Sequence, residues 1–163
     1  MPRLTDGRGY FGIGIESPKV GHNIGTLWRS AYAFDAAFIF TIGARYTKQA
    51  SDTSCTWRHI PLLHFETFEH FQKARPRDCE LIGVELTPDA IELRRFAHPQ
   101  RAMYLLGAED DGLSEQAARA CRDILVIPVS FCLNVATAGS IVMYDRTAKQ
   151  CRSMATQRKG PTE

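Results

Sequence analysis

The sequence predicts one α/β domain with a mostly parallel sheet flanked by helices. Five apolar blocks are almost continuous instead of alternating with polar residues, which is typical of parallel strands covered on both faces. Segments with helical spacing separate these blocks, as crossover connections between parallel strands require. The 163 residues are enough for a single domain with a real core.

The predicted elements follow from local residue patterns. Strands are expected at residues 10–16, 36–43, 79–86, 102–107 and 124–129, with a candidate sixth strand at 60–65. Helices are expected between them at residues 23–34, 67–74 and 114–122. Asn23 and Ser114 are expected to cap the first and the third of these helices.

Residues 124–144 form a charge-free, largely apolar run that approaches the length of a membrane span. The run contains Pro128, Asn134 and several small residues. We therefore divide it into a buried strand that ends at Pro128 and a buried helix over residues 133–150. On this interpretation the chain has no membrane span.

Composition and charge place few limits on partners. The net charge is +2 and the apolar content 44%, so an RNA partner would need a local basic face. Five scattered cysteines without a CxxC pair disfavour a zinc ribbon and are typical of reduced thiols. The N-terminus has no apolar signal region, and we expect a cytoplasmic protein. The domain is expected to cover residues 1–150, and residues 151–163 form a polar, flexible tail that is either solvated or contacts RNA.

Asn23 and Arg29 are polar residues on an otherwise apolar helix that follows a glycine-flanked loop. Backbone N–H groups at such a helix start point outward and can bind a ligand. The Lys-Ser/Thr pair of a nucleotide-binding P-loop is missing from this loop. Taken alone, the pattern also fits a helix cap and a surface cation.

Two further stretches place a polar residue directly after a strand. Gly107 ends one strand, and Glu109 stands where a dinucleotide-binding loop has its middle glycine. A carboxylate there would repel a pyrophosphate but could bind a hydroxyl, an amine or an arginine, or belong to a solvated turn. Asn134 lies at the start of the last helix among small residues, where a buried amide must find hydrogen-bond partners.

These three stretches, in this order, resemble the motifs of the SpoU (TrmH-like) branch of the SPOUT RNA methyltransferases. The matching segments are "NIGTLWR" at 23–29, "LLGAEDDGLS" at 105–114 and "IPVSFCLNVATAG" at 127–139. The resemblance covers roughly residues 10–148. Two departures are that Cys132 replaces the usual serine and that the loop before Leu133 is shorter than in many members.

The resemblance implies a SPOUT-type fold with a C-terminal trefoil knot, a homodimer, and methyl transfer from S-adenosylmethionine to a ribose 2′-hydroxyl of tRNA or rRNA. The compact domain is compatible with a tRNA substrate, and small members of the family often act on the anticodon loop, so tRNA is favoured over rRNA. Arg29 is the implied catalytic residue, and Asn23, Glu109 and Asn134 would orient it and the ribose. The active site of such enzymes forms at the dimer interface, so Arg29 would serve the cofactor of the other subunit.

Cofactor contacts are expected from loops at strand ends, where open α/β sheets bind ligands. The motif positions imply Glu85, Leu106, Gly107, Glu109, Ile127, Val129, Leu133 and Ala138. Glu85 fits a solvated acid at a strand end equally well. The histidines are dispersed, and we expect no metal site.

Two other functions remain open at this stage. One is a non-catalytic RNA-binding homodimer that keeps the methyltransferase fold, which the Cys132 substitution favours. The other is a nucleotide-binding oxidoreductase, which is disfavoured because no GxGxxG follows the first strand.

Overall fold

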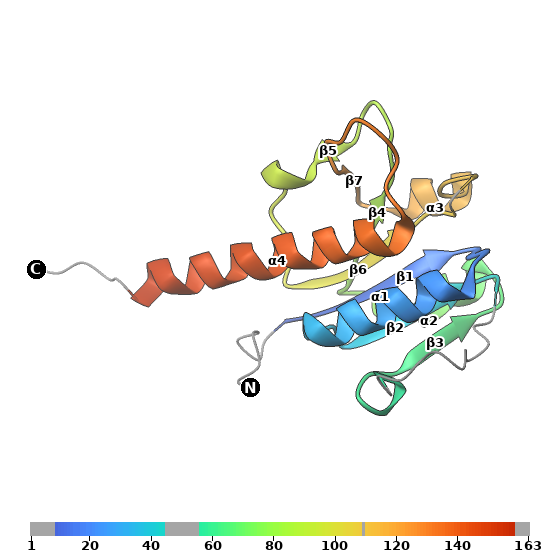
Figure 1. The fold of residues 1–163 in the computed structure, drawn as a ribbon, viewed down its shortest axis with the longest axis horizontal. Helices are drawn as coiled ribbons and strands as arrows, with labels where there is room; N and C mark the ends of the chain where they lie inside the picture. The colour runs from blue at the N-terminus through green and yellow to red at the C-terminus, as the bar shows by residue number, and fades with distance from the viewer. Residues whose placement is uncertain (1–8, 45–55, 109, 159–163) are drawn as a thin grey trace, which may run out of the picture.

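The computed structural model describes residues 9–44, 56–108 and 110–158, the segment 152–158 by its backbone alone (Figure 1). Its sheet has seven strands, all parallel, in the order β3-β2-β1-β6-β4-β7-β5. The strands are β1 Tyr10–Glu16, β2 Phe38–Ile42, β3 Leu62–Phe65, β4 Glu80–Val84, β5 Ile91–Glu92, β6 Arg101–Leu106 and β7 Asp123–Val126. The parallel sheet and the candidate sixth strand are confirmed, whereas the two-residue β5 was not predicted.

Two helices cover each face of the sheet. They are α1 Gly21–Ala33, α2 Phe68–Ala74, α3 Glu115–Ala120 and α4 Val135–Arg158, with short 3-10 turns η1 Thr56–Arg58 and η2 Leu93–Arg95. One core layer contains α1 and α4, and the other contains α2 and α3. Figure 1 shows α1 (blue) and α4 (red) side by side over the same face.

The central strand β1 explains why its apolar run does not alternate. Phe11, Ile13 and Ile15 point to the layer formed by α1 and α4, and all are at most 1% exposed. The glycines between them leave room for large rings on the other face. A Cβ at Gly12 would overlap the ring of Phe38, and a Cβ at Gly14 would overlap the ring of Phe40.

Small residues let α4 approach α1 closely. A Cβ at Gly139 would lie 2.5 Å from Cδ1 of Leu27. Beside this contact, the Ser140 hydroxyl donates a hydrogen bond to the Ala136 carbonyl of its own helix, and the same oxygen is hydrogen-bonded to Ser30 Oγ of α1, both at 2.8 Å. The small residues of the apolar run therefore serve close helix packing. The trefoil knot stays a prediction of the family resemblance.

Several element boundaries differ from those predicted. α1 begins at Gly21 with Val20 in the capping position, so the prediction that Asn23 caps this helix is wrong. Ser114 does cap α3, since its side chain accepts a hydrogen bond from Ala117 N at 3.1 Å. α4 continues to Arg158, although a flexible tail was expected from residue 151.

The apolar run divides as predicted, into β7 and the start of α4. Within the described residues, no helix is long and apolar enough to cross a membrane.

Candidate active site

The carboxyl ends of the central strands converge at one edge of the sheet. Leu106 of β6 is paired with Ile15 of β1 and with Val84 of β4, which is itself paired with Leu125 of β7. The residues that follow these strands therefore meet in one place. This edge is where open parallel sheets bind their ligands.

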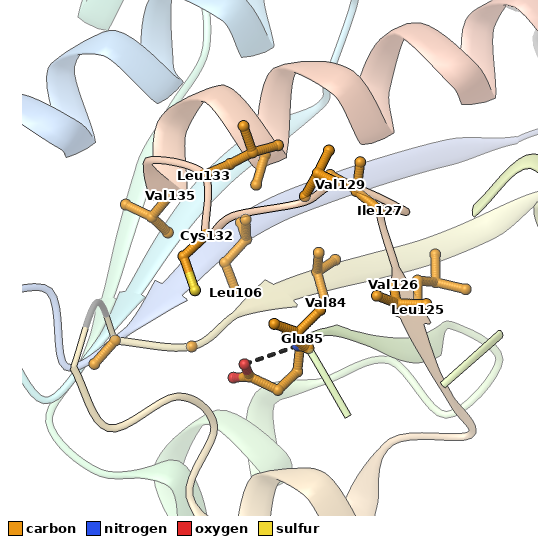
Figure 2. A pocket seen from close by; sticks show the side chains of 14 residues that line it. Val84, Glu85, Leu106, Leu125, Val126, Ile127, Val129, Cys132, Leu133 and Val135 are labelled. Carbon is orange, nitrogen blue, oxygen red and sulfur yellow. Dashed lines mark hydrogen bonds between the residues drawn. The ribbon is translucent and has the colours of Figure 1, made fainter. Parts of the chain in front are cut away.

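A cavity of about 160 Å³ lies at this edge, between the ends of β4, β6 and β7 and the start of α4. Figure 2 shows Val84, Leu106 and Cys132 around a common space. The predicted cofactor residues that line it are Glu85, Leu106, Gly107, Ile127, Val129, Leu133 and Ala138. Glu109, predicted for both cofactor binding and catalysis, lies outside the described residues.

Half of the lining residues were not predicted: Val84, Leu86, Ala108, Leu125, Val126, Cys132 and Val135. Most of them are next to a predicted residue in the chain. Extending each predicted strand-end segment by one residue in both directions would have included them. The cavity walls are mainly apolar side chains and strand-end backbone, which suits an aromatic base more than a phosphate.

Glu85 fixes the loop between β6 and α3. Its carboxylate oxygens accept hydrogen bonds from the backbone N–H groups of Leu86 and Leu113, both at 2.9 Å (the first is dashed in Figure 2). A Cβ at Gly107 would lie 2.6 Å from this carboxylate, and a Cβ at Gly112 would lie 2.4 Å from it. Glu85 thus lines the cavity as predicted, but its oxygens already hold the loop, so it is not a freely solvated acid.

Glu16 holds the same loop from a second strand, and the sequence prediction missed it. Although only 6% exposed, its carboxylate accepts hydrogen bonds from Ser114 N at 2.9 Å and from Ser114 Oγ at 2.7 Å. The two carboxylates therefore bind consecutive backbone N–H groups, at Leu113 and Ser114. An acid that ends an apolar strand was the available signal.

Asn23 and Asn134 are joined by a hydrogen bond between the first and third motifs. Asn134 Nδ2 donates to Asn23 Oδ1 at 2.9 Å, and Asn134 Oδ1 accepts from the N–H groups of Ala136 and Thr137. Asn134 therefore caps α4. The prediction that it is buried is wrong, because the residue is exposed while Asn23 is buried.

Arg29 does not join this constellation within one chain. It is exposed on α1, does not line the cavity and forms no ion pair with any described residue. Six residues of helix separate it from Asn23, a rise of roughly 9 Å. The structure therefore gathers the second and third motifs with Asn23, and leaves Arg29, the predicted catalytic residue of the first motif, exposed to solvent.

The motifs and the fold are both shared with known proteins. A profile of the SpoU rRNA methylase family matches residues 11–144. The chain belongs to this family. The family predicted from the three motifs is thereby confirmed.

Individual relatives are distant in sequence. The mouse (Mus musculus) protein named tRNA (guanosine(18)-2′-O)-methyltransferase TARBP1 is 24% identical over 139 residues, which are 78% of this chain and 9% of that protein. The chain therefore spans less than a tenth of that relative's length.

Solved structures share the fold at similarly low identity. The SpoU methyltransferase AviRb from Streptomyces viridochromogenes, in complex with the cofactor AdoMet, has a TM-score of 0.79 at 22% identity, covering 88% of this chain and 62% of that one. A structure concerning the 2-OH methylation of C/U34 on tRNA has a TM-score of 0.76 at 23% identity, covering 89% and 98%. These matches confirm the SPOUT-type fold.

In the part of the chain that the structure describes, His, Cys, Asp and Glu side chains form no cluster of three or more that could hold an ion.

Proposed function

We propose that this chain transfers the methyl group of S-adenosylmethionine to a ribose 2′-hydroxyl in tRNA. The observation that carries the proposal is the cavity at the carboxyl edge, which the second and third family motifs line together. The names of relatives support the finer assignment, since one is a tRNA 2′-O-methyltransferase and another structure concerns position 34 of tRNA.

The cavity fits S-adenosylmethionine by the chemistry of its walls. Ile127, Val129 and Leu133 would pack against the adenine ring, and backbone groups beside Leu106 and Gly107 would bind its polar atoms. When bound, the cofactor supplies a methyl group activated by a positively charged sulfur. The fixed loop after β6 keeps the cavity in shape before binding, which lowers the ordering cost.

Arg29 would act on the ribose rather than on the cofactor. A guanidinium group stays protonated near neutral pH, so Arg29 stabilises negative charge that develops on the 2′-oxygen instead of removing its proton. The same group can hold an RNA phosphate and so position the ribose. Both roles need an exposed, unpaired arginine, as observed among the described residues.

We propose that Arg29 completes the cavity of a second copy of the chain. Its exposed position on α1, apart from the cavity of its own subunit, supports a homodimer with composite active sites. Sedimentation analysis is expected to give a dimer. A monomer that transfers methyl groups at full rate would contradict this part of the proposal.

The decisive test measures transfer from radiolabelled S-adenosylmethionine to unmodified tRNA and rRNA pools. Label is expected in a 2′-O-methylated nucleotide of tRNA, and Arg29→Ala is expected to lower kcat at least a hundredfold with cofactor affinity unchanged. Arg119→Ala is the matched control, since it removes an exposed arginine whose ion pair within the described residues is with Glu115. Label on a base, or full activity of Arg29→Ala, would refute the proposal.

One observation favours a second candidate, a non-catalytic RNA-binding homodimer. Cys132 lines the cavity where the family usually has serine, and a thiol is a weaker hydrogen-bond donor than a hydroxyl. That candidate predicts RNA binding without cofactor binding. Calorimetric titration with S-adenosylmethionine separates the two, and a gain of activity in Cys132→Ser would show that the thiol weakens catalysis without abolishing it.

A further inference from the structure

A group of ring and guanidinium side chains lies beside α1, outside the cavity lining. We call Tyr32, Trp57, Arg58 and His59 the ring cluster. The rings of Tyr32 and His59 are stacked, with centroids 4.4 Å apart and planes at 12°. The Arg58 guanidinium carbon lies 5.0 Å from the centre of the Trp57 ring. One stacked ring pair and one cation–ring contact are therefore already formed on this surface.

The backbone that carries the ring cluster is anchored to the core. Thr56 and Ile60, on either side of the cluster residues of η1, are 1% and 8% exposed. Trp28 of α1 donates a hydrogen bond from Nε1 to the Ile60 carbonyl at 3.1 Å. Yet Tyr32 and Trp57 remain 45% and 43% exposed. Rigid placement of large exposed rings is expected of a binding surface rather than of a solvated turn.

The ring cluster is continuous with the proposed catalytic arginine. Arg29 and Tyr32 are three residues apart on α1, which makes them neighbours on the helix surface. Neither α1 nor residues 56–60 contain an Asp or Glu, while Arg29 and Arg58 add two positive charges. Exposed rings beside cations are the features that bind single-stranded RNA by stacking and charge.

The geometry points to the ring cluster as a stacking site for an unpaired base of the RNA substrate, near the ribose that Arg29 engages. The base would extend the Tyr32–His59 stack, and Arg58 would contact a phosphate. The choice of RNA as occupant rests on the proposed function. An unpaired base is specified because bases in a duplex have no open face to offer.

The test uses two fluorescent single strands of about ten nucleotides, a length in the range that one binding site covers. One is oligouridylate, and the other has the same charge but abasic riboses. Tyr32→Ala is expected to weaken oligouridylate binding about five- to a hundredfold and to leave binding of the abasic strand unchanged. Tyr32→Phe keeps the ring and is expected to bind like wild type. His59→Ala provides a second variant should Tyr32→Ala fold poorly.

The cation of the cluster has a different expected signature. Arg58→Ala should weaken binding of both strands and lower the salt dependence of log K by about 0.7, the value for one phosphate contact on a single strand. Arg119→Ala, on the opposite face of the sheet, should change neither. Equal binding of the two strands by wild type, or unaltered binding by both ring variants, would overturn the inference. So would a shift from dimer to monomer in Tyr32→Ala, because a second copy would then be the occupant.

Failure of this inference is distinguishable from failure of the proposed function. If wild type methylates tRNA while both ring variants keep full RNA affinity, the stacking site is refuted and the function stands. If wild type neither methylates RNA nor binds S-adenosylmethionine, but the ring variants still lose oligouridylate, the stacking site stands and the function is refuted. For an active enzyme, we expect Tyr32→Ala to raise KM for tRNA more than it lowers kcat.

Discussion

The two ends of the sheet use polar side chains in different ways. At the carboxyl edge, Glu16, Glu85 and Asn134 accept hydrogen bonds from backbone N–H groups, and a cavity remains open between the strands. Toward the amino end of β6, polar side chains are bonded to one another beneath α4. Helix α4 therefore begins at the cavity. About three turns later it contributes Arg146 to this network of hydrogen-bonded side chains.

We call Arg146, Tyr104, His98, Asp145 and Lys149 the buried polar chain. Arg146 donates to Tyr104 Oη at 3.1 Å, Tyr104 Oη lies 2.6 Å from His98 Nδ1, and His98 Nε2 lies 2.8 Å from Asp145. Lys149 completes the buried polar chain, because its Nζ lies 2.6 Å from the Asp145 carboxylate. A neutral His98 protonated at Nε2 satisfies every partner. Backbone tethers therefore shape the site, whereas a side-chain network stabilises the fold.

The largest effect on stability is expected at Arg146. Arg146 is 1% exposed and also donates to the carbonyls of Pro99 and Gln100 at 2.7 and 2.8 Å. Arg146→Ala removes three hydrogen bonds of a buried guanidinium and leaves a cavity beneath α4, so we expect a loss of about 3 to 5 kcal/mol in the free energy of unfolding by urea titration. The exposed control Arg119→Ala should lose less than about 0.5 kcal/mol. Equal losses would show that the buried polar chain is not stabilising.

A pH titration tests the same network without mutation. Burial, helped by the positive charges of Arg146 and Lys149, lowers the pKa of His98 from 6.5 to about 4. Between these pH values the unfolded chain binds a proton that the folded chain does not. The stability contribution is therefore complete above pH 6.5 and is lost as the pH falls toward 4, by roughly 3 kcal/mol. Urea unfolding across this range should show that slope in wild type and a smaller one in His98→Gln.

The third effect tests the carboxyl edge. Gly112 has φ +66°, and a Cβ there would press on the Glu85 carboxylate. Gly112→Ala should cost about 2 kcal/mol in stability and weaken cofactor binding at least tenfold, because the loop moves. Gly43→Ala has similar strain at φ +86° without touching the cavity residues, so it should lose stability alone. Calorimetry with S-adenosylmethionine gives the affinities, and equal affinities for both variants would contradict the tethering role.

The smallest effect is expected at the start of α4, where Asn134 caps the helix. Asn134→Ala removes the helix cap and the bond to Asn23, for an expected loss of about 1 kcal/mol in stability and a several-fold weaker cofactor affinity. Thr67→Ala removes the cap of α2, whose side chain accepts from His70 N at 3.2 Å, far from the cavity. Thr67→Ala should lose about as much stability as Asn134→Ala and keep the wild-type affinity for S-adenosylmethionine. If both variants lost cofactor affinity, the Asn134 cap would act through the stability of the whole domain.

Much of the site was predictable because it lies in segments directly after apolar strands. Leu106, Gly107, Ile127 and Leu133 were predicted from motif position, and parallel pairing brings them to one cavity. Glu16 was missed because its partner lies 98 residues away in the chain. No local pattern reports such a bond.

The parallel sheet follows from the sequence, because nearly continuous apolar runs are typical of strands covered on both faces. The meeting of the strand-end motifs follows as well, because the carboxyl ends of parallel strands share one edge. The environment of individual polar side chains is set by the folded chain. Arg146 is buried although charged side chains are mostly exposed, while Asn134 was predicted to be buried and is exposed. The physical reason is that burial of a polar group depends on partners from distant segments, which only the folded chain assembles.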